Sequence, residues 1–319
     1  MYKVSVIIPV YNAEKYIERC ARSLFEQTLD DIEYIFVDDC TPDNSIEVLH
    51  QVIAEYPQRR DHVVILRHTS NTGQSGARKD GMSKATGQFI IHCDADDWVD
   101  LDMYEHMYKK AVEDHVEAVC CDIVLEHDTF SKVLSYNNEH EDHELMYGCI
   151  APISVEYFSM CNRLVSRKVY ERHEILPFEG VNMWDDVGLS IRVRYYIRST
   201  SVINKAYYHY NRQNLTSTTK RPLLDRLREQ VLCVNYIEDF FKEAQAWEKY
   251  RHFTSYLKIH TKEEIFTYDA KLWAKTFREA RKDLWKLRKL YRRKQLFKYY
   301  TLSYGGYLGK LIWKIWWKR

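Results

Sequence analysis

The sequence has no apolar run long enough to cross a bilayer, so we expect no transmembrane helix. It has no cysteine spacing typical of a zinc site, because its eight cysteines are scattered and the one close pair, Cys120-Cys121, is adjacent. No signal peptide is visible, since Met1-Tyr2-Lys3 leads directly into a strand-like segment. Because 45% of the 319 residues are hydrophobic, we expect one large or two modest globular domains. The scattered cysteines are expected to be reduced thiols in the cytoplasm.

The chain also has almost no net charge, but its charges are unevenly distributed. The net charge is +1, yet residues 271–319 contain sixteen Lys or Arg against two acids, Glu279 and Asp283. The preceding residues are therefore acidic overall. A basic, aromatic C-terminal segment predicts an anionic partner.

Short β-branched runs alternate with amphipathic segments over the first 125 residues. This alternation predicts a mostly parallel sheet with helices on both faces. Within it we expect a helix over 45–56, with Asn44 as its cap and Glu47 completing a capping box. The expected strands are residues 4–10, 33–37, 62–66, 89–93 and 118–124.

Polar residues follow three of these strands, where ligands bind in parallel sheets. The densest group is Asp94-Ala95-Asp96-Asp97, directly after the apolar run 89–93. Carboxylates packed this closely repel one another unless a cation or a set of donors neutralises them. The group therefore predicts a divalent metal, Mn²⁺ or Mg²⁺, and with it a phosphate ligand.

Several segments in a fixed order make the pattern specific, although each is weak alone. The segments are residues 4–12, 37–43, 71–73, 76–78, Gly87, 94–97 and 184–186. In order and spacing they resemble family 2 glycosyltransferases with the GT-A fold, over roughly residues 1 to 215.

The resemblance implies an α/β, Rossmann-like GT-A domain over 1–220, followed by a helical region over 221–319 with a basic amphipathic tail. It also implies an enzyme that moves a sugar, with inversion, from a nucleotide diphosphate to an acceptor hydroxyl. The donor is expected to be a UDP-sugar, and the acceptor a saccharide or lipid-linked saccharide of a surface polysaccharide. A divalent cation and an Arg would stabilise the negative charge on the departing nucleoside diphosphate.

By the same resemblance, Asp96 and Asp97 lie nearest the metal, and Asp94 shapes the loop or contacts the ribose. Asp39 corresponds to the aspartate that reads the nucleotide base, with Asp38 as a neighbouring alternative. The competing interpretation is that Asp38 and Asp39 only cap the following turn.

The rest of the expected donor site comes from several loops. Pro9, Tyr11 and Glu14 are expected to complete the base and ribose pocket. Arg78 is expected to face phosphate at a helix start, with a surface salt bridge as its alternative. Arg212 is expected to close over the donor or to lie on a mobile surface.

Asp186 resembles the catalytic base of the family, and Asp185 is expected to support it. Inversion requires a carboxylate beside the acceptor hydroxyl to remove its proton. Capping of a helix over 187–194 is the alternative role for this pair. Asn162-Arg163 is a further candidate for the acceptor border.

In the tail, apolar residues recur at intervals of four and three and predict one helical stripe. Together with the Trp and Lys residues of 308–319 it favours peripheral binding to the inner face of an anionic membrane, with packing on protein as the alternative. The stripe consists of Trp273, Phe277, Ala280, Leu284, Leu287 and Tyr291. The His-rich stretch 126–144, with His127, His140 and His143, is interpreted as an exposed loop or sheet edge.

Two other functions remain open from sequence. A nucleotidyltransferase acting on sugar phosphates would usually need a Gly-rich basic loop after the first strand, where this chain has Tyr11-Asn12-Ala13-Glu14. A non-enzymatic nucleic-acid-binding protein would explain the basic tail but not the aspartates. We therefore expect no nucleic-acid partner.

Overall fold

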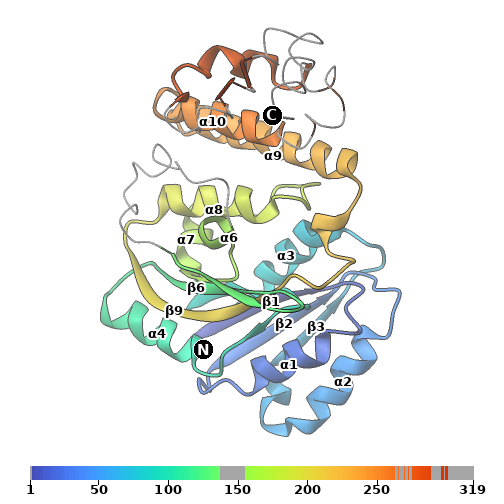
Figure 1. The fold of residues 1–319 in the computed structure, drawn as a ribbon. Helices are drawn as coiled ribbons and strands as arrows, with labels where there is room; N and C mark the ends of the chain where they lie inside the picture. The colour runs from blue at the N-terminus through green and yellow to red at the C-terminus, as the bar shows by residue number, and fades with distance from the viewer. Residues whose placement is uncertain are drawn as a thin grey trace. The chain divides into compact units, whose positions relative to one another are not determined.

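The computed structural model describes residues 2–136 and 155–262, and beyond them residues 265, 269, 272, 275–288, 296, 297, 299 and 300. Two compact units divide the chain, one containing the described residues up to 220 and the other those from 221 onward. The first unit is built on a mixed sheet (Figure 1). Its strands are β1 Val4–Val10, β2 Ile32–Asp38, β3 Val63–Arg67, β4 Phe89–His92, β5 Trp98–Val99, β6 Ala118–Glu126, β7 Ser131–Leu134, β8 Arg163–Ser166 and β9 Thr200–Asn211.

The sheet has the strand order β3-β2-β1-β4-β8-β6-β9-β5, with β7 paired to β6. Its first four strands are parallel, as the alternating pattern predicts. Beyond β4 the sheet is mixed, because β8 runs antiparallel to both β4 and β6. Strand β6 forms where a strand was expected over 118–124, but β8 and β9 carry no alternation strong enough to be predicted, so the mixed pairing around β6 was not expected.

Helices cover both faces of the sheet (Figure 1). Side chains of β1 alternate between the two layers, with Val6 and Ile8 packed toward α1, α2 and α4, and Ile7 toward α3, α7 and α8. The helices and 3-10 turns of this unit are α1 Ile17–Phe25, α2 Ser45–Glu55, η1 Pro57–His62, α3 Gly73–Lys84, α4 Met103–Glu113, α6 Val155–Phe158, α7 Arg167–Arg172, α8 Asp185–Tyr196 and η3 Thr218–Lys220.

Helix α2 forms where expected, but its predicted cap is wrong. Asn44 stands at the N-cap position without a side-chain capping bond. Its amide donates instead to Glu14 Oε1 at 3.2 Å. Asp43 takes over the capping role of Asn44, because Asp43 Oδ1 accepts the backbone N–H of Ser45 at 3.2 Å. The start of α2 is thereby joined to the loop after β1.

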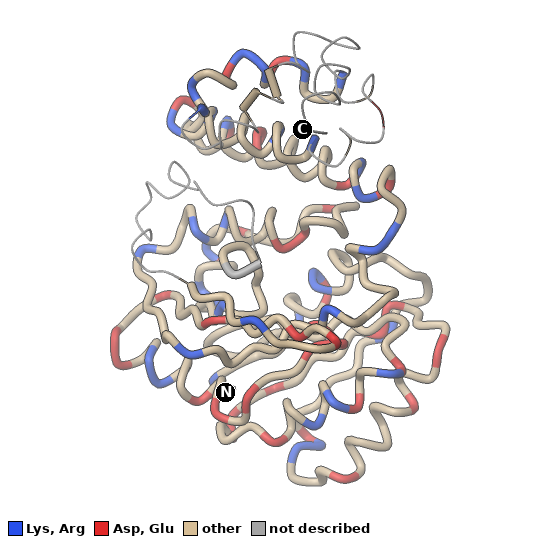
Figure 2. Tube along the Cα trace, in the orientation of Figure 1, with Lys and Arg blue, Asp and Glu red and all other residues tan. Residues whose placement is uncertain are grey.

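The second unit pairs α9, Leu223–Glu243, with α10, Trp247–Thr261. Phe241 stacks on Tyr250 with ring centroids 4.5 Å apart. Acidic and basic residues are interspersed along both units (Figure 2). Among them, the buried Lys258 binds Glu238 and also Glu279, the latter at 2.9 Å.

The expected helical stripe of the tail is only partly described, because Trp273 and Tyr291 lie outside the described residues, as does 301–319. The described part is the 3-10 helix η4, Arg278–Asp283, followed by a turn, so a continuous α-helix is not observed here. Phe277, with φ of 45°, has a left-handed backbone that interrupts α-helical geometry. The buried members of the stripe, Ala280, Leu284 and Leu287, belong to the unit that contains α10. Packing on protein is therefore what this part shows.

The His-rich stretch begins as a hairpin. His127 lies in the turn between β6 and β7 and stacks on Phe130, with ring centroids 4.3 Å apart. Strand β7 forms an edge of the sheet, where Val133 is exposed. His140 and His143 lie outside the described residues.

Candidate active site

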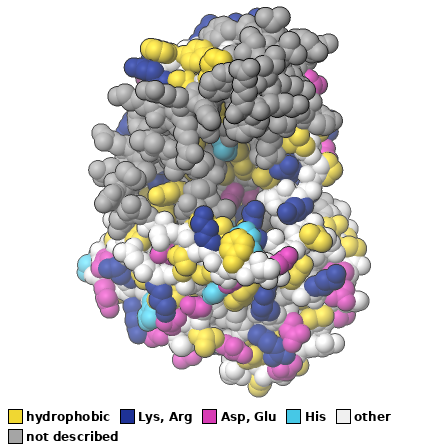
Figure 3. Space-filling view, viewed as in Figure 1, with side chains coloured by type: hydrophobic (Ala, Val, Ile, Leu, Met, Phe, Trp, Pro, Cys, Tyr) yellow, Lys and Arg dark blue, Asp and Glu magenta, His cyan; other side chains and the backbone are white. Residues whose placement is uncertain are grey.

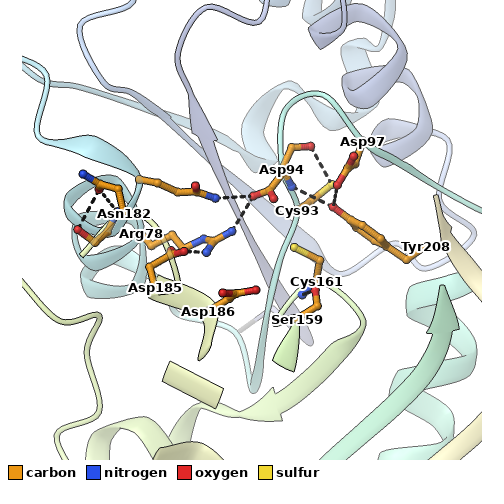
Figure 4. Close-up of polar contacts among 12 residues, drawn as sticks. Arg78, Cys93, Asp94, Asp97, Ser159, Cys161, Asn182, Asp185, Asp186 and Tyr208 are labelled. Atoms are coloured by element: carbon orange, nitrogen blue, oxygen red, sulfur yellow. Dashed lines mark hydrogen bonds and ion pairs between the residues drawn. The ribbon is translucent and has the colours of Figure 1, made fainter. Parts of the chain in front are cut away.

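The parallel strands β1, β2, β3 and β4 end at the same edge of the sheet, and the predicted site residues gather there. The segment after β4 carries Asp94, Asp96 and Asp97. Helix α3 and the start of α8 supply residues that reach the same place (Figure 4). Three separate stretches of sequence therefore form one site.

Arg78 of α3 is the connection among them (Figure 4). Its side chain is 2% exposed, and it donates from Nη2 to Asp94 Oδ1 at 2.6 Å and from Nη1 to Asp185 Oδ2. Burial by itself would lower the pKa of the guanidinium, but Asp185 and Asp94 outweigh it and raise that pKa well above its usual value. Arg78 is thus a buried cation with two carboxylate partners, which differs from the surface salt bridge considered from sequence.

The acidic segment is held by the end of β9 and the loop that follows it. Asp97 is buried, with Oδ2 accepting from the Tyr208 hydroxyl at 2.5 Å and Oδ1 from the backbone N–H of Asn211 at 2.7 Å. Asp96 Oδ2 accepts from Asn214 Nδ2 at 2.7 Å. The 211–214 part of the loop, expected near the diphosphate, is therefore in direct contact with this segment.

Oxygen ligands suit the expected Mn²⁺ or Mg²⁺, and Asp94 and Asp96 present them at the end of β4. Burial, together with the charge of Asp94, raises the pKa of Asp96 to about 6, which marks negative charge that a cation would relieve. Asp97, the other expected ligand, is less accessible, since it is almost fully buried and is held by the Tyr208 hydroxyl and the backbone N–H of Asn211. Within the described ranges, no three His, Cys, Asp or Glu side chains form a ready-made metal cluster. The remaining ligands would have to come from phosphate and water, as is usual for Mg²⁺.

Asp185 and Asp186 begin α8 after Trp184, whose φ of 75° is left-handed. Asp185 is buried on Arg78, whereas Asp186 is partly exposed and accepts only the backbone N–H of Val187, at 2.8 Å, among its described contacts. Burial and the adjacent Asp185 raise the pKa of Asp186 to about 7. Such a carboxylate can accept a proton near neutral pH.

Asp39, at the end of β2, is 2% exposed and lies in a dense set of donors. Its Oδ1 accepts from His68 Nδ1 at 2.8 Å and from both the backbone N–H and the hydroxyl of Thr72, at 2.7 and 2.8 Å. Its Oδ2 accepts from the backbone N–H of Gly73 at 2.8 Å. Asp39 therefore fixes the loop that begins α3.

Asp38 adopts the turn-capping geometry, because its Oδ1 accepts the backbone N–H of Thr41 at 2.9 Å. The Thr41 hydroxyl in turn accepts from the backbone N–H of Asn12 at 2.8 Å. Glu14 is exposed, and its backbone N–H donates to Asp43 Oδ2 at 2.9 Å. The loops after β1 and β2 are joined along their length by these bonds.

The other predicted residues differ in exposure. Pro9 is half-buried in β1, where it pairs with Val37, while the Tyr11 side chain is 52% exposed. Arg212 is exposed, with its guanidinium 5.6 Å from the Tyr210 ring centroid. The candidates for the acceptor border, Asn162 and Arg163, are both fully buried, so they do not face a ligand as expected.

Sequence reasoning missed three contributors to this site. Tyr208 holds Asp97, but one of three tyrosines in a strand that was not predicted gives no signal of that contact. Arg19 of α1 donates to the backbone carbonyl of Asp96 at 3.3 Å and lies 3.4 Å above the Trp98 ring. His68 follows β3 directly and would have been found only by asking what neutralises Asp39.

The fold is that of a GT-A glycosyltransferase. Residues 5–173, more than half of the chain, match the model of glycosyl transferase family 2, and the chain belongs to that family. It is therefore an enzyme that transfers a sugar, as the ordered motifs predicted.

Named glycosyltransferases are similar to this chain. EpsH of Bacillus subtilis (strain 168) is 29% identical over 267 residues, which cover 81% of this chain and 75% of EpsH. YibD of Escherichia coli (strain K12) is 40% identical over 119 residues, covering 37% of this chain and 33% of YibD. A poly(ribitol-phosphate) beta-glucosyltransferase of Bacillus spizizenii (strain W23) is 40% identical over 100 residues, covering 30% and 15% of the two chains.

Solved structures share the fold at low identity. Residues 1–349 of S. aureus TarS, in complex with UDP-GlcNAc, superpose with a TM-score of 0.72 at 15% identity, covering 99% of this chain and 92% of that one. The mannosyltransferase PcManGT of Pyrobaculum calidifontis, in complex with GDP-Man and Mn²⁺, gives 0.53 at 16% identity, covering 100% and 89%. These likenesses confirm the expected GT-A fold.

Replacing Arg78 by Met should leave the buried Asp185 and the half-buried Asp94 without their cation and lower the free energy of unfolding by about 3–5 kcal/mol. Adding Asp185→Asn to Arg78→Met should recover part of that loss, because one uncompensated charge is removed. Chemical denaturation of the four proteins of the cycle measures both effects.

The matched control is Arg22→Met, which removes a half-buried arginine paired with the exposed Glu18 and Glu55. It should cost no more than about 1 kcal/mol. Strict additivity of the Arg78 and Asp185 substitutions would contradict the assignment of a coupled buried pair.

Proposed function

We propose that this enzyme is an inverting, metal-dependent glycosyltransferase that uses a UDP-sugar and a hydroxyl of a saccharide or lipid-linked saccharide. The observation that carries the proposal is the meeting of two acidic groups through Arg78, namely Asp94 with Asp96 after β4 and Asp185 with Asp186 at α8. The first group suits a donor diphosphate with its metal, and the second suits an acceptor.

The donor side of the proposal rests on oxygen ligands and on the loops around them. Asp96, with Asp94 beside it, would hold the Mn²⁺ or Mg²⁺, which when bound would stabilise negative charge on the diphosphate leaving group. Asp39, Pro9, Tyr11 and Glu14 surround the place for the base and ribose, and Arg212 is exposed on the loop that contacts Asp96. TarS with UDP-GlcNAc and PcManGT with GDP-Man and Mn²⁺ support a nucleotide-sugar donor.

The acceptor side assigns the base to Asp186 and a supporting role to Asp185. Asp186 has an oxygen without a described partner and a pKa raised to about 7, so it can take the proton of an attacking hydroxyl. Asp185 is engaged by Arg78, which fixes the start of α8 and the direction of Asp186. Similarity to a poly(ribitol-phosphate) beta-glucosyltransferase supports a surface-polymer acceptor.

The two alternatives considered from sequence have less support. A nucleotidyltransferase would need basic residues around the loop after β1, but that loop is joined to acidic partners, with Glu14 bound to Asp43 and Asn44. A nucleic-acid-binding surface would need a continuous basic face. On the described part of the face in Figure 3, basic, acidic and hydrophobic side chains are interspersed.

The metal assignment predicts that UDP or a UDP-sugar raises the melting temperature in Mn²⁺ or Mg²⁺ and much less in chelator, because a ligand that binds the native state stabilises it. Asp96→Asn should remove most of the metal-dependent part of that shift. A thermal-shift screen of nucleoside diphosphates and sugar nucleotides measures it.

Asp114→Asn is the control, since this carboxylate is paired with Lys110 on the surface at 2.8 Å. It should leave the metal-dependent shift unchanged. Equal shifts with metal and with chelator in the parent protein would contradict the role of a cation.

The base assignment predicts that Asp186→Asn lowers kcat by about 10²–10⁴-fold while donor binding is kept.

The base assignment also predicts a pH dependence, because in the parent enzyme the carboxylate of Asp186 must be deprotonated to act. With its pKa raised to about 7, kcat/KM should rise with pH below about 7 and level off above it. Initial rates across pH, with donor affinity measured separately, test both statements. A flat profile, or loss of donor binding in Asp186→Asn, would contradict the role.

We also propose that the basic, Trp-containing tail binds the inner face of an anionic membrane, on the strength of its composition alone. The structure has no helix, among the residues it describes, that is long and apolar enough to span a bilayer. Residues 308–319 lie outside the described part, and Lys with Trp in this pattern is typical of interfacial segments.

Replacing Lys310, Lys314 and Lys318 by Glu in the full chain should weaken binding to vesicles that contain anionic lipid by about 100-fold or more, since each basic residue near such a surface contributes about 1 kcal/mol. Vesicle co-sedimentation measures the affinity. The control triple variant changes the exposed Lys109, Lys132 and Lys168 to Glu. Equal binding by the two variants would argue against the tail as the membrane contact.

A further inference from the structure

We propose that His68, held between Asp39 and Asp80, is a positioning residue that fixes Asp39 as a hydrogen-bond acceptor and so determines which nucleobase the enzyme accepts. The inference deepens the proposed function and rests on it for the presence of a nucleotide. It assigns a role to two residues, His68 and Asp80, that no motif in the sequence singles out.

The contacts around His68 hold the imidazole ring on two sides. Its Nδ1 lies 2.8 Å from Asp39 Oδ1, and its Nε2 lies 3.0 Å from Asp80 Oδ2. Its backbone N–H donates to the carbonyl of Asp38 at 2.9 Å, so the residue is also fixed along the main chain. The contact of Nε2 with Asp80 brings a negative charge close to the ring without hydrogen-bond geometry, whereas Nδ1 meets both Asp39 and, at 3.0 Å, the Thr72 hydroxyl. Asp80 is therefore the outer support of a ring that is oriented mainly through Nδ1.

The same contacts decide how much acceptor capacity Asp39 has left. A carboxylate offers about four acceptor sites. His68 and the two donors of Thr72 all meet Oδ1, whereas Oδ2 accepts only from Gly73 N–H among the described residues. One acceptor position on Oδ2 therefore remains, and its direction is set by the bonds on the opposite oxygen.

A fixed acceptor distinguishes nucleobases by the hydrogen on their ring nitrogen. Uracil presents N3–H and guanine N1–H, and either can donate to Oδ2. Cytosine N3 and adenine N1 carry no hydrogen, so each would place a lone pair against the carboxylate. A site built to accept a hydrogen bond rejects ligands that cannot donate one, because its buried acceptor is then left unpaired. The ligand class is thus a nucleoside diphosphate whose base has a ring N–H.

Substitutions at His68 can separate its two contacts. His68→Asn retains an amide donor near the place of Nδ1 and loses the contact with Asp80. His68→Gln places its donor near the position of Nε2, toward Asp80, and loses the contact with Asp39. Asp80 is exposed, with 54% of its side-chain area accessible, so Asp80→Ala removes the outer support without disturbing the core.

The test is isothermal titration of UDP, GDP and CDP, each with Mg²⁺, into the full chain and its variants. The parent should bind UDP or GDP at least about tenfold more tightly than CDP. His68→Gln should lose about tenfold in affinity for the preferred base with little change for CDP, while His68→Asn should keep the preference. Asp80→Ala should reduce the preference by a smaller factor. It tests the positioning role of His68 independently if a His68 variant does not fold.

The matched control is His106→Asn. Like His68, His106 lies against a carboxylate, that of Asp102 at 3.3 Å, and a hydroxyl, that of Tyr207 at 2.5 Å, but it belongs to α4. It should leave the base preference unchanged. A role of His68 in stability alone would lower the affinities for all three nucleotides together.

Three outcomes would overturn a claim, and they are distinguishable. A parent that binds no nucleoside diphosphate contradicts the proposed function itself. A parent that binds UDP, GDP and CDP equally contradicts the acceptor on Asp39. A parent that discriminates, together with His68→Gln and Asp80→Ala that discriminate equally well, contradicts the positioning role of His68 alone.

Discussion

The buried guanidinium of Arg78 is the interaction on which the rest of the site depends. It joins Asp94, which follows β4, to Asp185, which starts α8. Its positive charge offsets the repulsion between the two acidic groups, so they can lie close together. A neutral side chain at this position would leave both carboxylates in a poorly hydrated place. The cation therefore has a structural role of its own, and it sets the separation between the segment of Asp94 and the start of α8.

A second set of bonds performs the same task at the end of β2. Asp39 holds the start of α3 through Thr72 and Gly73, and α3 carries Arg78 one and a half turns further on. Helix α3 is thus anchored at Asp39 and again, through Arg78, at the acidic segment that follows β4. Asp97 has a related role, because Tyr208 and Asn211 tie the acidic segment to the end of β9. Several of the acidic residues in this region serve to hold the others in place.

The sequence predicts the parallel half of the fold well because its signals are local. Runs of β-branched residues give β1 to β4, and the ordered aspartate motifs identify the family. The mixed half was not predicted, since β8 and β9 are short or irregular and their pairing partners are distant along the chain. The predicted cap Asn44 was wrong for a tertiary reason, because its side-chain amide donates to Glu14, which approaches from the loop after β1. The prediction for Asn162 and Arg163 was also wrong, because polar residue type alone does not reveal burial inside a sheet.

The links within the site also have a consequence for how the protein folds. Arg78 and Asp185 are 107 residues apart in sequence, and Asp97 and Asn211 are 114 apart. Contacts that close such long loops form slowly compared with those inside helices and hairpins. During synthesis, β1 to β4 and their helices emerge long before α8 and β9 do. We therefore expect a nascent chain with a largely formed sheet to lack a working site, with nucleotide binding arising only in the last stage of folding.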